Sequence, residues 1–372
     1  MLGALAAGAG AAHWRTHQAP APPAVPHDAA IAALRATDGS DGFAHAEAAR
    51  MFAFPRDHGP HGDFRAEWWY FTGHLRTPEG RPFGFQLTVF RYELDAAIIT
   101  SSSAWRTPRV LLAHFALSDI AGHAFHPFER YSRAVPAVAG IRADPLALWL
   151  DDWRIDYAAD SDRWHLSAAQ GDIALALQLD GASAIVLQGD KGLSRKSASA
   201  GNASYYYSVP RLNARGTLTV GGTVHAVDGT AWLDREWSSG ALAREQQGWD
   251  WFGLQLDSGA SLMFYRLRGA DGNTGQFSDG TLIGADGHRQ RLSATAVALT
   301  ALGAWTSPYT GTRYPQGWRL TVVGAGLDLL LTPRLPDQEW RARLRYWEGA
   351  VAVTAVADGR PLGLGYVELT GY

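Results

Sequence analysis

The fold is decided by residues 67–91, which read EWWYFTGHLRTPEGRPFGFQLTVFR. Apolar and aromatic side chains alternate with a period of two in the runs Trp68 to Leu75 and Phe83 to Tyr92, and the turn dipeptide Glu79-Gly80 separates the runs. Since alternate side chains of a strand point to opposite faces of a sheet, this pattern predicts two antiparallel strands joined as a hairpin.

The same pattern continues to the end of the chain. Further alternating runs occupy residues 110–118, 173–179, 184–188, 217–220, 249–256, 262–267, 318–323, 327–331, 350–356 and 365–370. Turn dipeptides recur between them, for example Asp180-Gly181, Asp228-Gly229 and Asp358-Gly359. No long amphipathic helix and no alternation of strands with helices is visible. We therefore expect an all-β protein of antiparallel sheets, in barrels or sandwiches.

An internal echo indicates two copies of one unit. In the first half, Glu67 is followed by an aromatic run, a glycine turn and a strand that ends in Phe90-Arg91. The second half repeats this order with Asp250-Trp251-Phe252, a turn at residues 257–259 and a strand through Arg266. We expect a leader over 1–27, a short helical or irregular segment over 28–51, one barrel over 52–215 and a second over 216–372, with the junction just after Pro210. The alternative is one large sheet system with a chance echo.

Composition excludes several function classes. The 372 residues are 47% hydrophobic and 19% charged, with a net charge of −3, which predicts a globular core and no footprint for nucleic acid. The absence of cysteine excludes disulfides, thiolate catalysis and zinc–thiolate sites. Nucleophile-elbow, Walker and dinucleotide motifs are also absent, so neither a serine hydrolase nor a nucleotide enzyme is indicated.

The N-terminus indicates export. Residues 1–12 read MLGALAAGAGAA, a small apolar run too short to span a bilayer, and a polar, proline-rich stretch follows at 18–26. This looks like the tail of a secretory signal, so we expect a periplasmic or secreted protein. A disordered alanine-rich leader is the alternative.

The segment 230–238 carries the strongest candidate chemistry. On a strand, Trp232, Asp234 and Glu236 share one face, while Leu233, Arg235 and Trp237 share the other. Two carboxyl groups beside a tryptophan can divide into a protonated acid and an ionised base, because apolar surroundings and a second carboxylate both raise a carboxyl pKa. The alternative is a solvated strand face.

Two acid–arginine pairs are predicted at corresponding places in the two halves. Glu67 is expected to pair with Arg91, and Asp250 with Arg266 or Arg268, as buried bidentate contacts that hold strands together. The stretch FPRDHGPHGDFR at 54–65 contains two histidines and two aspartates, but its spacing matches no strong ligand pattern, so no metal site is predicted.

Five motifs together carry a family resemblance. They are FPRDHGPHGDFRAEWWYFTGHL at 54–75, GTAWLDREWSSG at 229–240, WDWFGLQLDSG at 249–259, YWEGAV at 346–351 and GYVELTGY at 365–372. In this order they resemble the AttH-like and carotenoid 1,2-hydratase family. The resemblance implies two lipocalin-like β-barrels packed side by side, a pocket in or between them, and action on apolar isoprenoid- or polyketide-like compounds. Arg235 stands where the hydratase branch carries a histidine, so the chain looks closer to the AttH-like branch, which resembles accessory proteins encoded beside ABC-type exporters.

Three functions remain open. The first is a cofactor-free hydro-lyase, isomerase or cyclase acting on a hydrophobic compound, with Asp234 and Glu236 as the acid–base pair and Asp250 with Arg266 orienting them. The second is a monomeric carrier of an apolar ligand that works with an ABC-type transporter, and the third is a lipid-ester hydrolase. The residues expected to bind the ligand are Glu67, Trp68, Trp69, Tyr70, Arg91, Tyr206, Arg235, Trp237, Trp251 and Tyr265.

Overall fold

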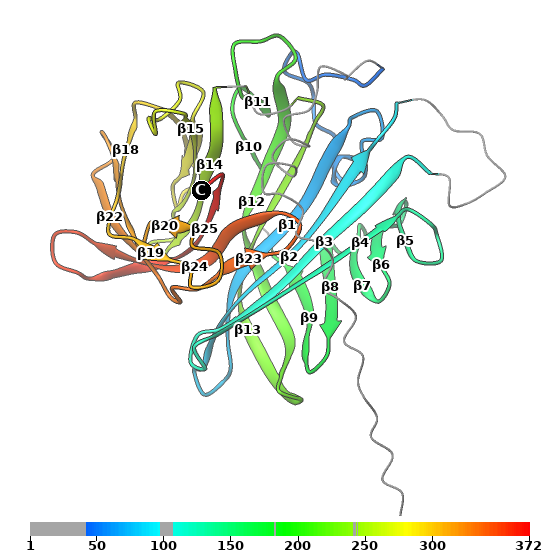
Figure 1. The fold of residues 1–372 in the computed structure, drawn as a ribbon, viewed down its shortest axis with the longest axis horizontal. Helices are drawn as coiled ribbons and strands as arrows, with labels where there is room; N and C mark the ends of the chain where they lie inside the picture. The colour runs from blue at the N-terminus through cyan, green and yellow to red at the C-terminus, as the bar shows by residue number, and fades with distance from the viewer. Residues whose placement is uncertain (1–41, 97–106, 182–183, 241–242, 244) are drawn as a thin grey trace, which may run out of the picture.

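The computed structural model describes residues 42–96, 107–181, 184–240, 243 and 245–372. It is an all-β protein with two lipocalin-like, barrel-like antiparallel sheets, one coloured blue to green and the other yellow to red in Figure 1. The expected leader lies outside the described residues. Residues 42–51 form no helix, and the helical structure in the described residues is one 3-10 turn, η1 (Arg56–His58). No described helix has the length and apolar character needed to cross a membrane.

The first sheet has 13 strands in the order β4-β3-β2-β1-β13-β12-β9-β8-β7-β6-β5, with β10 and β11 added alongside β12. Their bounds are β1 (Ala66–Arg76), β2 (Pro82–Glu93), β3 (Arg109–Asp119), β4 (Ala124–Arg133), β5 (Ala139–Ala143), β6 (Leu146–Leu150), β7 (Trp153–Ala158), β8 (Arg163–Gln170), β9 (Ile173–Asp180), β10 (Val186–Leu187), β11 (Leu193–Arg195), β12 (Ala203–Val220) and β13 (Thr223–Ser238). The sheet curls so that Arg130 of β4 donates hydrogen bonds to the carbonyls of Leu150 and Ala169 at 3.3 and 3.1 Å.

The second sheet has 10 strands in the order β17-β16-β15-β14-β25-β24-β22-β21-β18, with β23 paired to β24. Their bounds are β14 (Gln246–Leu256), β15 (Ser261–Gly269), β16 (Asp279–Ile283), β17 (Arg289–Ser293), β18 (Val297–Ala301), β21 (Trp318–Val322), β22 (Leu327–Pro333), β23 (Glu339–Arg341), β24 (Arg345–Ala355) and β25 (Pro361–Thr370). A separate two-stranded ribbon contains β19 (Trp305–Thr306) and β20 (Arg313–Tyr314).

The internal echo corresponds to equivalent hairpins in the two sheets. The first strand of each sheet pairs with the second and also with the last, β1 with β2 and β13, and β14 with β15 and β25. Glu67 lies directly opposite Arg91 on β2, and Asp250 lies directly opposite Arg266 on β15. The two halves of the sequence therefore use the same strand arrangement around the same acid–arginine pair.

The chain passes from one sheet to the other later than the sequence suggested. The expected junction at 215/216 falls inside β12, and β13 still belongs to the first sheet, so the change occurs between Ser238 and Gln246. Pro210 is not a domain break. It lies where the β12–β13 register shifts between Val209 and Leu212, a bulge at which a residue without an N–H is tolerated.

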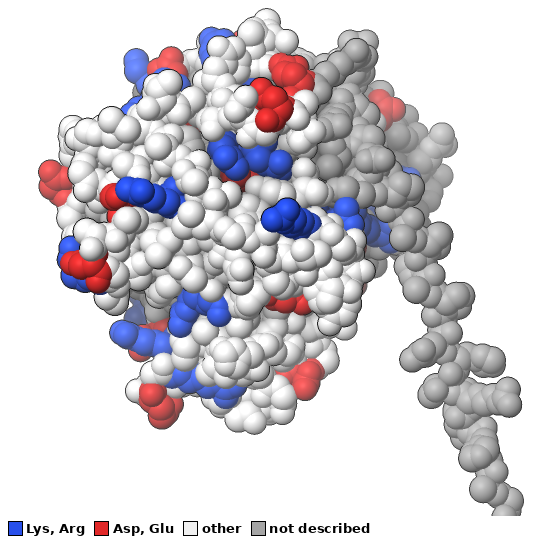
Figure 2. All heavy atoms as spheres, turned by 60° about the vertical axis from the view of Figure 1, so that its left-hand side comes forward, with Lys and Arg blue, Asp and Glu red and all other residues white. Residues whose placement is uncertain are grey.

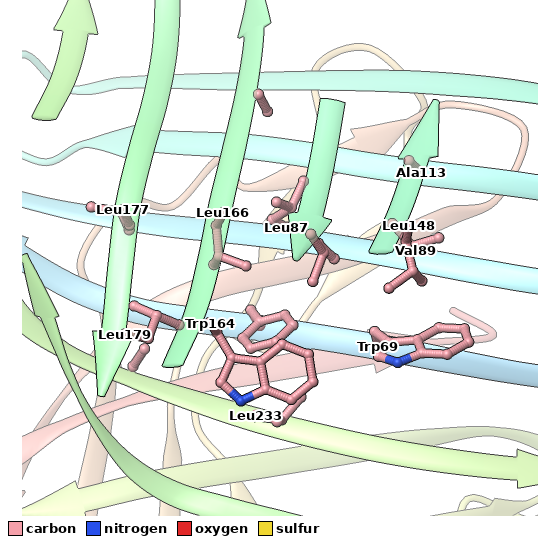
Figure 3. Close-up of a cluster of buried hydrophobic side chains, with 14 of the residues drawn as sticks. Trp69, Leu87, Val89, Ala113, Leu148, Trp164, Leu166, Leu177, Leu179 and Leu233 are labelled. Carbon is pink, nitrogen blue, oxygen red and sulfur yellow. The ribbon is translucent and has the colours of Figure 1, made fainter. Parts of the chain in front are cut away.

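Each barrel has its own apolar core. Figure 3 shows part of the first, where Trp69 of β1 and Leu233 of the neighbouring β13 are drawn together with Trp164 of β8. The second core contains Phe252, Trp318 and Trp347 among its fully or almost fully buried side chains. On the face drawn in Figure 2, charged side chains of both signs are scattered among uncharged ones, with no large patch of one sign.

Strands at the junction of the barrels are buried on both faces. Strands β7, β8 and β9 alternate buried and more exposed residues, as expected when one face of a sheet meets solvent. In contrast, most of β1, β14 and the second half of β13 are buried at successive positions. One face of these strands packs inside its own barrel and the other packs toward the neighbouring barrel.

The contact between the barrels is an aromatic layer with polar links. Its buried side chains come from both sheets, namely Tyr70, Tyr206 and Trp232 from the first and Trp251, Met263, Tyr265, Leu267, Ala350 and Tyr366 from the second. Close approach requires a glycine at position 84, since a Cβ there would lie 2.4 Å from the Tyr366 hydroxyl. Gln255 of the second barrel donates to the carbonyls of Pro210 and Ala231 at 2.7 and 3.1 Å.

Buried ion pairs fix the first hairpin of each barrel, as the sequence predicted. Arg91 and Arg235 donate to opposite oxygens of Glu67 at 2.5 and 2.8 Å, and all three side chains are 0% exposed. Burial alone would raise the pKa of Glu67, but the two guanidinium groups hold it well below its usual range. Arg266 and Arg268 both bind Asp250 in the second barrel.

The loop at 54–65 covers the Glu67 cluster. His58 hydrogen-bonds the Tyr207 hydroxyl at 2.6 Å, and His61 stacks on Trp237 with ring centroids 3.7 Å apart. Asp57 accepts hydrogen bonds from Arg50 and the Ala53 N–H. In the described part of the chain, no group of three or more potential ligands could hold a metal ion. Through these contacts the loop packs against the first barrel.

We predict that Glu67→Gln lowers the free energy of unfolding by about 3–5 kcal/mol, because it removes the buried carboxylate between two guanidinium groups: Arg235 loses its counter-charge, while Arg91 keeps its second pair, with Glu93 at 3.0 Å. The matched control is Asp328→Asn, which breaks the exposed Arg319–Asp328 pair and should cost about 0–1 kcal/mol. Urea denaturation of both variants at neutral pH measures the difference. Equal, small losses in the two variants would contradict a supporting role for Glu67.

Candidate functional site

A cavity of about 220 Å³ lies between the two barrels. Strands of the first sheet (β1, β2, β12, β13) and of the second (β14, β15, β24, β25) both contribute to its wall. The aromatic residues that line it are Trp68, Tyr70, Phe90, Tyr92, Tyr206, Trp249, Trp251, Tyr265 and Tyr346. These residues sit on the outward face of their strands, which explains why β1 is aromatic on both faces.

Two carboxyl groups of the first barrel reach this cavity from β13. Asp234 and Glu236 lie on the same face, two residues apart, and are 4% and 7% exposed. Asp234 accepts hydrogen bonds from the Ser208 hydroxyl at 2.5 Å, from the Trp232 indole at 2.7 Å and from the Tyr206 hydroxyl. Burial raises the pKa of Asp234 to about 7, although the three donors act to lower it.

Glu236 has a cationic partner in the cavity wall. The Lys196 ammonium lies 3.0 Å from Glu236 Oε1, and the Ser204 hydroxyl donates to the same oxygen. Burial would lower the pKa of Lys196, but the Glu236 carboxylate raises it, so the Lys196 ammonium keeps its charge. The ammonium also lies 4.2 Å from the centre of the Tyr265 ring.

The second barrel contributes a pair of glutamates from neighbouring strands. Glu368 on β25 lines the cavity and lies directly opposite Glu348 on β24. The Trp249 indole donates to Glu368 at 2.6 Å, and the Tyr70 hydroxyl donates to Glu348 Oε1 at 2.7 Å. No N–H or hydroxyl reaches Glu348 Oε2, and its carboxyl neighbour is Glu368.

This pair must retain a proton at neutral pH. Burial and the neighbouring Glu368 raise the pKa of Glu348 well above its usual value, and burial raises the pKa of Glu368 to about 7. Two adjacent buried carboxyl groups without a cation cannot both be ionised at low cost. Glu348 and Glu368 therefore share a proton at neutral pH, and Glu368 is the member of the pair that faces the cavity.

Glu236 and Glu368 occupy corresponding places in the two barrels. On the closing strand of the first barrel, Glu236 lies opposite Trp68 of β1, and on that of the second, Glu368 lies opposite Trp251 of β14. The neighbours beyond them differ, since Glu236 faces Tyr206 on β12 while Glu368 faces Glu348 on β24. One repeated position thus yields a lysine-paired carboxyl group on one wall and a proton-sharing acid on the other.

The hydroxyl of Tyr346 is held by a buried histidine. It lies 2.7 Å from His114 Nδ1, and His114 Nε2 lies 3.3 Å from Glu129 on the neighbouring strand. Burial lowers the pKa of His114, which favours the neutral ring. The neutral ring can accept from Tyr346 through Nδ1 while it donates through Nε2 to Glu129, so this cavity residue has a fixed orientation.

A model of AttH-like proteins matches residues 45–372. The chain belongs to the AttH-like family. The crystal structure of an AttH-like protein from Nitrosomonas europaea is 36% identical, covers 89% of this chain and 100% of its own, and superposes with a TM-score of 0.79. No protein in a comparison with functionally curated sequences matches.

Solved structures with more distant sequences share the fold. Kievitone hydratase from Nectria haematococca is 15% identical over 89% of this chain and 96% of its own, with a TM-score of 0.68. CghA in complex with Sch210972 is 15% identical over 90% of this chain and 97% of its own, with a TM-score of 0.54. The two-barrel architecture is thus common to proteins whose sequences have diverged widely.

The cavity of this AttH-like chain contains part of the site predicted from sequence. It brings together Trp68, Tyr70, Tyr206, Asp234, Glu236, Trp251 and Tyr265. The other predicted residues, Glu67, Trp69, Arg91, Arg235, Trp237, Asp250 and Arg266, do not line it. Strand alternation is the reason: Arg235 and Trp237 lie on the opposite face of β13 from Asp234, and Trp69 packs in the first barrel core.

Two of these corrections change the chemistry. Arg235 is fully buried over the Trp69 ring, 3.7 Å from its centre. The position at which this chain has arginine where the hydratase branch is expected to have histidine therefore lies inside the first barrel and not at the cavity. Asp250 on β14 and Arg266 on β15 lie on the faces that point to the second barrel core, so they cannot orient the Asp234–Glu236 pair. Their role here is to hold β14 and β15 together.

Sequence reasoning missed Glu368, Glu348, Trp249, Tyr346 and Lys196. Glu368 could have been found by extending the internal repeat to the closing strands, since an acid follows the same aromatic register in both halves. Lys196 carried a compositional signal, because the chain has only two lysines, Lys191 and Lys196, among its 33 basic residues. Glu348 lies in the YWEGAV motif, but only long-range strand pairing places it beside Glu368, and His114 gave no signal.

We predict that Glu368→Gln stabilises the protein at alkaline pH and not at acidic pH. The folded-state pKa of about 7 exceeds the ordinary 4.5, so the wild type loses stability as pH rises from 4.5 to 7, while the glutamine variant does not. The advantage of the variant should grow over that window to about 2–3 kcal/mol and then level off. Thermal unfolding from pH 4 to pH 9 measures it.

The matched control is Glu47→Gln, at an exposed glutamate outside the cavity. Its stability relative to the wild type should change little over the same range. A Glu368→Gln variant that loses stability relative to the wild type as pH rises would contradict the raised pKa of Glu368.

Proposed function

We propose that this protein is a cofactor-free acid–base enzyme of the hydro-lyase, isomerase or cyclase type, acting on an apolar alkene bound between the barrels. The observation that carries the proposal is the pair Asp234 and Glu368. These two carboxyl groups come from different barrels, reach one aromatic cavity, and each has a pKa raised to about 7. A catalytic group transfers protons best when its pKa lies near the working pH.

The hydrogen bonds support a division of roles. Asp234 accepts three hydrogen bonds, which suits the ionised form of a base. Glu368 accepts one such bond, from Trp249, and shares a proton with the adjacent Glu348 on the cavity side, which suits the acid of the pair. Different environments around two carboxyl groups are the usual basis for an acid and a base in one site.

For hydration, the steps balance without another reactant. The proton of Glu368 adds to one alkene carbon, the π electrons form the new C–H bond, and the other carbon becomes cationic. The oxygen of a water molecule forms the C–O bond there, and the proton that water loses passes to the Asp234 carboxylate. Exchange with solvent returns Glu368 to the acid form and Asp234 to the base. The aromatic wall favours the cationic intermediate.

The comparisons support hydration as the first reaction to test. Kievitone hydratase, which shares the fold, is named for water addition. The chain itself belongs to the AttH-like family. If the cationic carbon loses a proton or is attacked by a second double bond of the same substrate, the same groups perform isomerisation or cyclisation. The substrate therefore decides among the three outcomes.

We predict that the wild type incorporates label when a panel of isoprenoid alkenes and enones is incubated in ¹⁸O-labelled water. Asp234→Asn and Glu368→Gln should each lower turnover by about 10²–10⁴-fold, because each removes one proton-transfer group. Product mass spectrometry measures label uptake, and calorimetry measures the affinity for the same alkene, which should stay within about threefold in both variants.

Asp328→Asn and Glu47→Gln supply the same side-chain changes away from the cavity and should leave turnover unaltered. Full turnover in both cavity variants would contradict the proposal. Tight binding of an alkene that no incubation alters would instead support the carrier function.

A further inference from the structure

The charges around the cavity are unbalanced. Asp234, Glu236 and Glu368 line it, and Lys196 is already paired with Glu236 at 3.0 Å. None of the described lysine, arginine or histidine side chains forms an ion pair with Asp234 or Glu368. Two carboxyl groups therefore face the cavity without a counter-charge from the described part of the protein.

Arg345 also borders the cavity but does not supply that charge. It lies on the face of β24 shared with Trp347, which packs in the second barrel core, and opposite to the face of Tyr346 and Glu348. Its positive charge acts on Tyr314, another residue of that core. Glu348, on the same face of β24 as Tyr346, forms no ion pair with a described lysine, arginine or histidine side chain.

The aromatic wall already accommodates one cation. The Lys196 ammonium lies over two cavity rings, 4.2 Å from the centre of Tyr265 and 5.6 Å from the centre of Tyr206. Ring faces carry negative electrostatic potential and attract ammonium groups within about 6 Å. The same ammonium is paired with Glu236, so aromatic rings and a carboxylate hold this cation together, and Trp68, Tyr70 and Trp249 are further aromatic members of the same wall.

We infer that the cavity takes an apolar cation, a positively charged centre with hydrophobic substituents, in preference to a neutral compound of the same shape. The aromatic rings would receive the substituents, and Asp234 and Glu368 would supply the counter-charge. The inference deepens the proposed function and rests on its site, since a protonated alkene is itself an apolar cation. A stable ammonium ligand presents the same chemistry.

The test compares two probes that differ in charge and share a shape, phenyltrimethylammonium and tert-butylbenzene, neither of which titrates over the pH range used. Isothermal titration calorimetry of the wild type should find the ammonium probe bound at least about tenfold more tightly at pH 8, since ring and carboxylate attraction both act on it. Its affinity should rise with pH through about 7, where Asp234 and Glu368 ionise.

Proton release gives a second readout. At about pH 6 the cation should bind with net release of protons, because it favours the ionised carboxylates, and the observed enthalpy should depend on the ionisation enthalpy of the buffer. The neutral probe should show no such dependence. Asp234→Asn and Glu368→Gln should each reduce the preference for the cation, while Glu47→Gln should not.

Equal affinities for the two probes, or cation binding without proton release, would overturn the inference. The outcomes also separate it from the proposed function. Tight ammonium binding with no turnover of any alkene would keep the inference, identify an ammonium ligand and remove the enzyme proposal. Competitive inhibition of alkene turnover by the ammonium probe would keep both and assign the charge to the reaction intermediate.

Discussion

Everything at the candidate site depends on strands that are buried on both faces. In an isolated barrel the outward side chains of β1, β13, β14 and β25 would meet water and would be polar. Here the two barrels pack these strands against one another, so the outward residues form an aromatic layer with one cavity in it. A carboxyl group on such a face is taken out of water without entering the core of either barrel.

This arrangement gives the inner and outer faces of the strands at the barrel junction opposite electrostatics. On the inner face, Glu67 meets two guanidinium groups and its pKa falls. On the outer face, Asp234 and Glu368 meet hydroxyl and indole donors but no cation, and burial raises both pKa values to about 7. The first kind of acid stabilises the fold, and the second kind costs stability at neutral pH. Such a cost is expected where function requires a strained or poorly solvated group.

The sequence was sufficient for the fold class and for local pairing. Two-residue alternation and glycine turns predicted antiparallel sheets, and the internal echo predicted equivalent hairpins with Glu67–Arg91 and Asp250–Arg266 pairs. It was not sufficient for choosing the face. When both faces of a strand are buried, Trp68 and Trp69 look alike in sequence, and only the position of the second barrel shows that Trp68 borders the cavity.

Long-range pairing explains the remaining differences. Glu348 and Glu368 share a site because β24 and β25 are neighbours in register, and His114 reaches Tyr346 because β3 packs against β24 across the barrel junction. Neither relation leaves a local pattern in the sequence. The misplaced domain junction has a similar cause, since Pro210 was interpreted as a break where β12 continues through a bulge.

The most direct test of this account is infrared difference spectroscopy of carboxyl groups across a pH titration. The account predicts a carbonyl band from protonated carboxylic acid that persists above about pH 5. The part from Asp234 and Glu368 fades with a midpoint near 7 and is reduced in Asp234→Asn and in Glu368→Gln, while the part from Glu348 persists to higher pH. Complete loss of the protonated band below about pH 5, or a band that neither variant changes, would show that the cavity acids are ordinary ionised carboxylates and would contradict the account.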